Sequence, residues 1–253
     1  MRVWTMAMSV LLAMTVSACQ LLGGGGTGRD VTQHFDDASA QELARAVSSG
    51  DRDGIRDLVA AGSPVDAVGK EGVTMLQWAV FEGQHGALST LLDLGADVEQ
   101  HGLGGSTVLH TAAQAPDVWF LDTLLETGVD PDLRHAVTEE TPLQAATGMG
   151  TDENFRLLLK HDADVRLADR NRTTALHLAA MLNAGSQVLA LLDRGADPLA
   201  VDRVGATFQD YFWTTNPNIM HDRALRERRK VADWLTARDI PLHEDAAWQK
   251  DKS

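Results

Sequence analysis

The fold of this chain is decided by two short stretches that return at a fixed interval, Thr174–Ala179 (TALHLA) and Leu191–Asp197 (LLDRGAD). A threonine followed two residues later by leucine occurs at intervals of 33 or 34 residues, at Thr74, Thr107, Thr141 and Thr174. Thr207 continues the series, with Gln209 where a leucine is expected. A fixed interval of this length indicates a repeated supersecondary unit.

Each repeat has the local chemistry of two short helices. The threonine hydroxyl can begin a helix by accepting a hydrogen bond from a free backbone N–H. The leucine two residues later and the alanine five residues later share one helix face. A leucine pair then precedes a glycine, which permits the left-handed backbone that ends a helix. Asp162 stands in one of these glycine positions, and aspartate tolerates that conformation better than most residues.

These motifs resemble the ankyrin repeat, whose consensus carries T-P-L-H-x-A and a later L-L-x-x-G-A-D. The best matches are Thr174–Ala179 and Thr107–Ala112, whereas Thr141–Ala146 keeps the proline and loses the histidine. The resemblance covers about residues 38–242 and implies an all-α solenoid of stacked helix-turn-helix units with β-turn or hairpin connections. It also implies that His110 and His177 bond to the backbone of the neighbouring turn.

The repeat spacing predicts a repeat domain at 37–242, followed by a polar tail at 243–253. The residues before the domain resemble a lipoprotein signal, which implies a signal peptide at 1–18 and a lipid anchor and flexible Gly-rich tether at 19–36. Within the domain we expect an N-terminal cap at 37–69, repeats at about 70–102, 103–136, 137–169 and 170–202, and a divergent C-terminal cap at 203–242. An insertion around Asn216–Asn218 delays the last helix, so we expect a loop or a longer helix there. We expect the polar tail to fray.

The first residues are typical of an export signal. After Met1 and Arg2, residues 3–16 are almost wholly apolar, which is too short for a membrane-spanning helix of about 20 residues. The run Val16–Cys19 resembles the lipobox of bacterial lipoproteins, which implies cleavage before Cys19 and its acylation by fatty acids such as palmitate. Gln20 resembles the outer-membrane pattern, so we expect a lipid-anchored protein on the periplasmic face of the outer membrane. The alternative is an ordinary secreted protein whose cysteine lies there by chance.

The composition excludes several classes of protein. Among 253 residues, 22 are Lys or Arg and 36 are Asp or Glu, giving a net charge of −14. A hydrophobic fraction of 44% is that of a globular chain, and the acidic balance argues against nucleic-acid binding. One cysteine excludes a disulfide framework and a multi-thiolate metal site.

Motifs for chemistry are largely missing from the sequence. It contains no H-x₃-H or H-E-x-x-H pair, no G-x-S-x-G elbow and no phosphate-binding loop. We therefore expect no catalysis, metal or cofactor. The alternative is an enzyme that uses Asp210, Tyr211 and His221 in the C-terminal unit.

One basic run occurs in the C-terminal insertion, comprising Arg223, Arg226, Arg228, Arg229 and Lys230. We interpret it as a solvated helix face balanced by Glu227 and Asp233. The alternative is a contact with anionic lipid headgroups or an acidic partner.

The resemblance implies that a protein partner binds the turn tips and the adjoining face of the first helices. Carried over, these positions are Lys70, Glu71, Phe81, Glu82, Leu103, Gln114, Val137, Met149, Arg170, Asn171, Met181 and Leu182. Six of them are apolar, which is a feature of interfaces, although some could pack on neighbouring turns. We expect Phe81, Met181 and Leu182 to anchor the partner.

The leading functional hypothesis is a monomeric, non-catalytic protein-binding module that acts as a scaffold or helper for a periplasmic partner. One alternative is an immunity protein that blocks a toxin delivered to the periplasm. Another is a structural envelope lipoprotein that has no specific partner.

Overall fold

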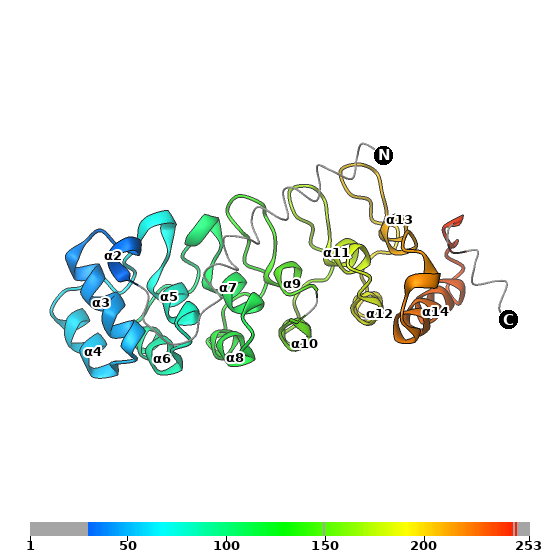
Figure 1. Ribbon diagram of the computed structural model, residues 1–253. Coiled ribbons are helices and arrows are strands. Elements are labelled where there is room, and N and C mark those ends of the chain that lie inside the picture. Colours follow the sequence, from blue (N-terminus) through cyan, green and yellow to red (C-terminus); the bar gives the residue numbers. More distant parts are fainter. Residues whose placement is uncertain (1–29, 149, 245, 247–253) are drawn as a thin grey trace. The chain divides into compact units, whose positions relative to one another are not determined.

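The computed structural model describes residues 30–148, 150–244 and 246 (Figure 1). The chain divides into two compact units, with unit 1 ending at Gly104 and unit 2 beginning at Gly105. Within the described residues the regular structure is helical, with two isolated bridges, Val68 to Thr74 and Ala168 to Thr174. The predicted signal peptide, Cys19, residues 20–29 of the predicted tether and Met149 lie outside the described residues.

Unit 1 consists of short helices that pack in pairs. Its elements are α2 (Val31–His34), α3 (Ala38–Ser49), α4 (Arg52–Ala60), η1 (Lys70–Gly72), α5 (Met75–Phe81) and α6 (His85–Asp93). Helices α3 and α4 form one pair, and α5 and α6 form the next, with α5 packed on α3 and α6 on α4. The stacked pairs share one apolar layer, as the repeat pattern predicts.

Unit 2 continues the same arrangement. Its elements are α7 (Val108–Gln114), α8 (Val118–Glu126), α9 (Pro142–Ala145), α10 (Asp152–Lys160), α11 (Ala175–Met181), α12 (Gly185–Asp193), α13 (Phe208–Phe212), η3 (Pro217–Ile219) and α14 (Asp222–Thr236). The short helix η2 (Leu103–Gly105) contains the division between the units. Figure 1 shows the pairs following one another along unit 2. The all-α architecture that the repeats predict is confirmed.

The five phased threonines begin the first helices through reciprocal capping. Each threonine hydroxyl pairs with the backbone N–H of the residue three positions later. The side chain of that residue in turn accepts a hydrogen bond from the threonine N–H. The pairs are Thr74 with Gln77, Thr107 with His110, Thr141 with Gln144, Thr174 with His177 and Thr207 with Asp210. Asp162 has a φ of 59°, so its predicted left-handed conformation is confirmed.

The leucines of the repeat form the core. Leu76, Leu109, Leu143 and Leu176 are each at most 2% exposed. Leu91, Leu124, Leu158 and Leu191 from the second helices are fully buried beside them. Removal of this apolar surface from water is the main stabilising contribution to stacked units.

The folded part begins earlier than the predicted boundary at residue 37. Asp30 caps α2 through the Thr32 N–H, and Phe35 is fully buried with its ring 5.5 Å from that of Trp78. Lys70 also pairs with Asp36, at 2.9 Å. Residues 30–36, which we predicted to be part of the tether, therefore belong to unit 1, because the side chain of Phe35 is buried against Trp78.

The first long helix also starts out of phase with the later ones. Counting back from Thr74 predicts a helix start near Gln41, whereas Asp37 caps α3 by accepting from the Ala40 N–H at 2.9 Å. An aspartate is as good a cap as a threonine, so the N-terminal unit gains one more helical turn. Gln41 instead donates to the Phe35 carbonyl at 2.9 Å and ties α3 to the preceding turn.

The C-terminal insertion forms η3 and the fifteen-residue helix α14, which corrects the interpretation of its basic run. Arg223, Arg226, Arg229 and Lys230 are exposed, as predicted, but Arg228 is only 1% exposed. Its guanidinium donates to the Thr215 carbonyl at 2.8 Å, to Asn183 Oδ1 at 2.7 Å and to the Phe212 carbonyl. Burial lowers the pKa of Arg228 to about 10.

The predicted fraying of the tail does not apply to its first residues. Gln209 donates to the Pro241 carbonyl at 3.0 Å and accepts from the His243 N–H at 3.1 Å. Ala246 is 1% exposed. The glutamine that breaks the leucine pattern thus holds the segment that covers the last helix pair.

We predict that Leu176→Ala lowers the free energy of unfolding by about 2–5 kcal/mol, because it leaves a cavity between stacked units. Urea unfolding of the full chain measures this change. Leu199→Ala is the matched control, since Leu199 is 62% exposed and its truncation should change stability by less than about 0.5 kcal/mol. Equal effects of the two variants would contradict the assigned packing.

Candidate functional site

The turns of unit 2 join one another into a continuous edge. Each turn donates a backbone N–H to a carbonyl of the preceding turn, with all three bonds at 2.8 Å: Ala136 to Gly105, Arg170 to Thr138, and Arg203 to Asn171. The tips therefore hold fixed positions relative to one another. Side chains on this edge are displayed by ordered backbone.

A side chain inside each turn fixes its shape. Asp169 Oδ1 accepts from the N–H groups of Asn171 and Thr173, at 2.8 and 2.7 Å. Asp202 Oδ1 accepts in the same way from Val204 and Ala206, at 2.9 and 3.0 Å. The turn between Asp130 and Thr141 is one residue longer than the others. There His135 Nδ1 takes this role by accepting from the N–H groups of Val137 and Thr138, each at 3.2 Å.

The histidines three positions after Thr107 and Thr174 also tie their helices to the next turn. His110 Nε2 donates to the Glu140 carbonyl at 2.9 Å, and His177 Nε2 donates to the Ala206 carbonyl at 3.2 Å. Because Nδ1 of each ring accepts from a threonine N–H, both rings carry their proton on Nε2. Both nitrogens of both rings are engaged with the backbone, as the resemblance implied.

Chemistry-bearing clusters are few in the part of the chain that the structure describes. It holds no group of three or more His, Cys, Asp or Glu residues suited to a metal ion. None of the described helices combines the length and apolar character needed to cross a bilayer.

The residues of the alternative catalytic hypothesis have structural partners. Asp210 accepts from the Thr207 N–H at 2.7 Å, and the Tyr211 hydroxyl donates to Asp202 Oδ2 at 2.5 Å. Burial, together with Asp202, raises the pKa of Tyr211. His221 is exposed at the start of α14, and no contact among the described residues links it to Asp210 or Tyr211. The three side chains do not form one constellation.

The predicted partner-binding residues divide by exposure. Eight of them are exposed: Lys70, Glu71, Gln114, Val137, Arg170, Asn171, Met181 and Leu182. Phe81, Glu82 and Leu103 are half-buried, and Met149 lies outside the described residues. The exposed apolar side chains are Val137 at 51%, Met181 at 40% and Leu182 at 46%, all in unit 2. Phe81, the third predicted anchor, belongs to unit 1.

Glu140 has an unusual environment at the edge of this surface. It lies in the turn that is one residue longer than the others. Its carbonyl accepts from His110 Nε2 and from the His135 backbone N–H. Burial raises the pKa of the Glu140 carboxyl to about 7, and repulsion from Asp169 adds to the effect. Sequence reasoning did not single out this residue, because the shift depends on the neighbouring turn.

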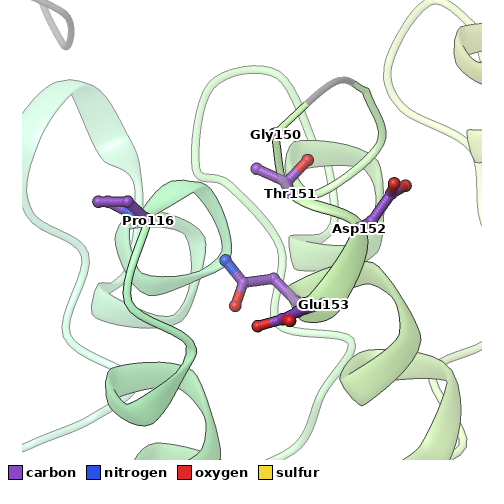
Figure 2. Close-up of a pocket in the computed structure, with 6 residues that line it drawn as sticks. Pro116, Gly150, Thr151, Asp152 and Glu153 are labelled. Carbon is purple, nitrogen blue, oxygen red and sulfur yellow. The ribbon is translucent and has the colours of Figure 1, made fainter.

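Unit 2 also contains a pocket of about 320 Å³ at the start of α10. Figure 2 shows Pro116, from the segment before α8, across the pocket from Thr151, Asp152 and Glu153. Gly150 and Asn154 complete its lining. Sequence reasoning did not single out Asn154, because its burial depends on the end of α7, which the fold brings to it.

A family model and a solved structure agree with this architecture, and one curated protein is similar in sequence. The family model described as ankyrin repeats (3 copies) matches residues 43–135 and 109–202. Protein PhlB of Serratia liquefaciens is 41% identical over 152 residues, which are 59% of this chain and 65% of PhlB. The chain therefore spans less than two thirds of the length of that relative. The crystal structure of the ankyrin repeat domain of Bcl-3, a member of the IkappaB family, matches with a TM-score of 0.63 and 27% identity, over 74% of this chain and 81% of that one.

The raised pKa of Glu140 predicts that stability falls as the pH rises. The carboxyl ionises near 4.5 in the unfolded chain and near 7 in the folded chain, so between these values the unfolded state binds fewer protons. Glu140→Gln removes this loss. We expect the variant to gain stability over the native chain at about pH 8 and little at about pH 4, as measured by urea unfolding.

The control for this measurement is Glu126→Gln on the exposed surface of α8, which should show no such pH dependence. A constant difference between the Glu140 variant and the native chain at both pH values would contradict the assignment.

Proposed function

Because the chain belongs to the ankyrin-repeat family, we propose that it is a lipid-anchored protein–protein interaction module of the bacterial cell envelope. It performs no chemistry itself and acts as a scaffold or helper for a protein partner on the periplasmic face of the outer membrane. The observation that carries the binding role is the ordered turn edge with apolar side chains exposed beside it.

Three of these side chains have the character of partner contacts. Val137 lies at a turn tip, and Met181 and Leu182 lie at the end of α11, each at least 40% exposed. Met181 and Leu182 are consecutive, and exposed apolar residues on an ordered surface are typical of interfaces. Methionine adapts its shape to a partner more readily than branched side chains do. Val137, Met181 and Leu182 therefore form the proposed contact.

The charge of the chain suggests what kind of partner approaches. A net charge of −14 attracts basic proteins at long range and speeds their encounter. It also disfavours nucleic acid, whose phosphates would be repelled. A basic protein partner fits both considerations.

The anchor is proposed from the sequence at residues 1–19. The apolar segment, the small residues and Cys19 support acylation of the cysteine thiol. Since the first described helix, α2, is capped by Asp30, residues 20–29 would connect the repeats to the lipid anchor. A Gly-rich coil of this length spans roughly 16–19 Å, which keeps the repeats close to the membrane surface.

We predict that replacing Met181 and Leu182 together by aspartate abolishes partner capture, because two charges would enter the proposed apolar contact. Crosslinking of the full chain in the cell, followed by mass spectrometry, identifies the partner and measures its recovery. Phe81 is left unchanged, since it is half-buried and a charge there would also disturb folding.

Leu199→Asp is the control, because Leu199 is 62% exposed but lies outside the first helices. Undiminished recovery with the double variant would refute the proposed contact. The partner's identity then separates the biological roles: an envelope enzyme supports a helper, whereas a toxin supports the immunity alternative.

We predict that Cys19→Ser moves the protein from the membrane fraction to the soluble fraction. The variant lacks the thiol that accepts an acyl chain, and two or more such chains are needed for stable attachment. Cell fractionation, together with the intact mass of the native protein, measures both events. An unmodified native thiol, or a variant that stays on membranes, would rule out the lipoprotein assignment.

A further inference from the structure

Two equivalent residues reach back from the start of a second helix to the preceding repeat. Asn154 is the third residue of α10, and Gln187 is the third residue of α12. Both side chains are buried, at 3% and 2% exposure. Each therefore needs hydrogen-bond partners for both its amide nitrogen and its carbonyl oxygen.

Gln187 finds partners for both ends of its amide. Its Nε2 donates to the Gly148 carbonyl at 3.0 Å and to Asp152 Oδ1 at 2.8 Å. Its Oε1 accepts from the Gly148 N–H at 3.1 Å. This junction is complete without any added group.

Asn154 is satisfied at one end only. Its Nδ2 donates to three carbonyls at the end of α7, those of Ala112, Ala113 and Ala115, at 3.3, 3.1 and 2.8 Å. Its Oδ1 is buried and has no hydrogen-bond partner within the part of the chain that the structure describes. The next residue along that wall is Pro116, which has no N–H to offer. The pocket wall thus holds a buried acceptor that lacks a donor, a costly arrangement.

The charges around the pocket decide what kind of donor it would take. The free N–H groups of a helix N-terminus favour anions, but Asp152 and Glu153 occupy that first turn, and Asp117 lies next to Pro116. Asp152 already accepts from Gln187, whereas the exposed Glu153 has no hydrogen-bond or ion-pair partner among the described residues. Arg223, a cation that interacts electrostatically with Asp152, is already paired with Glu227 at 2.9 Å. An incoming cation would find a free carboxylate here.

We propose that this pocket receives an arginine side chain of the protein partner. The guanidinium carries several N–H donors in one plane, which suits both a carboxylate such as that of Glu153 and an amide oxygen such as Asn154 Oδ1, two acceptors that line this pocket without a donor among the described residues. A volume of about 320 Å³ accommodates such a side chain. The inference rests on the proposed protein-binding function and adds a specificity point at the opposite end of the first helices from the turn tips.

The test titrates N-acetyl-arginine amide, as the probe, into the isotope-labelled full chain in detergent. NMR of the protein measures binding of the probe. We expect saturable shifts of the Asn154 side-chain amide and the Glu153 backbone amide at millimolar probe. Glu153→Gln should weaken binding by roughly threefold or more, since it removes the free carboxylate. Glu126→Gln, an exposed carboxylate on α8 outside the pocket, should leave binding unchanged.

Three results would overturn the inference: no saturation up to about 50 mM probe, equal shifts with N-acetyl-leucine amide, or equal binding by the Glu153 variant. A long-lived water seen beside Asn154 that persists at saturating probe would also overturn it, because water would then supply the missing donor. The probe experiment needs no partner, so failure of partner capture would sink the proposed function while leaving the result for the pocket unaffected.

Discussion

One side chain in each repeat both begins a helix and joins it to the next turn. His177 accepts from the Thr174 N–H at 3.2 Å and donates to the Ala206 carbonyl at 3.2 Å. Gln144 does the same through its two amide atoms, at 2.9 Å to the Thr141 N–H and 2.7 Å to the Thr173 carbonyl. The same side chain therefore fixes both the start of its helix and the position of the next turn. The positions of the turns consequently depend on how the helices beneath them are packed.

The polar groups at the end of unit 2 replace the neighbour that a further repeat would supply. Gln209 presents both amide atoms to the segment at Pro241 and His243, where an inner repeat buries leucine against leucine. Arg228 closes the same end by donating to neutral oxygens, and no carboxylate among the described residues pairs with it. A buried cation of this kind is held by hydrogen bonds rather than by charge pairing, which makes its three acceptors essential to its place.

The two candidate binding features use what the fold leaves over. The turn edge, whose backbone is bonded to neighbouring turns, exposes Val137, and the end of α11 exposes Met181 and Leu182. Asn154, which lines the pocket at α10, has a side-chain oxygen that lacks a hydrogen-bond partner among the described residues. The exposed apolar side chains offer contact area that needs no hydrogen bonds from a partner. The pocket offers one hydrogen-bond acceptor with a fixed direction. A partner that uses both would be recognised by shape and by one charged side chain.

The sequence by itself determined the repeat, its phase and its helix starts, because the threonine caps, buried leucines and left-handed Asp162 are local properties of a 33-residue unit. It also identified Val137, Met181 and Leu182 as exposed apolar positions. Tertiary structure alone decided the places of Phe35, Arg228 and Asn154. Phe35 is buried by Trp78, Arg228 by oxygens of Asn183 and of the segment at Phe212 and Thr215, and Asn154 by the end of α7. Each depends on groups brought from distant positions, which no local pattern encodes.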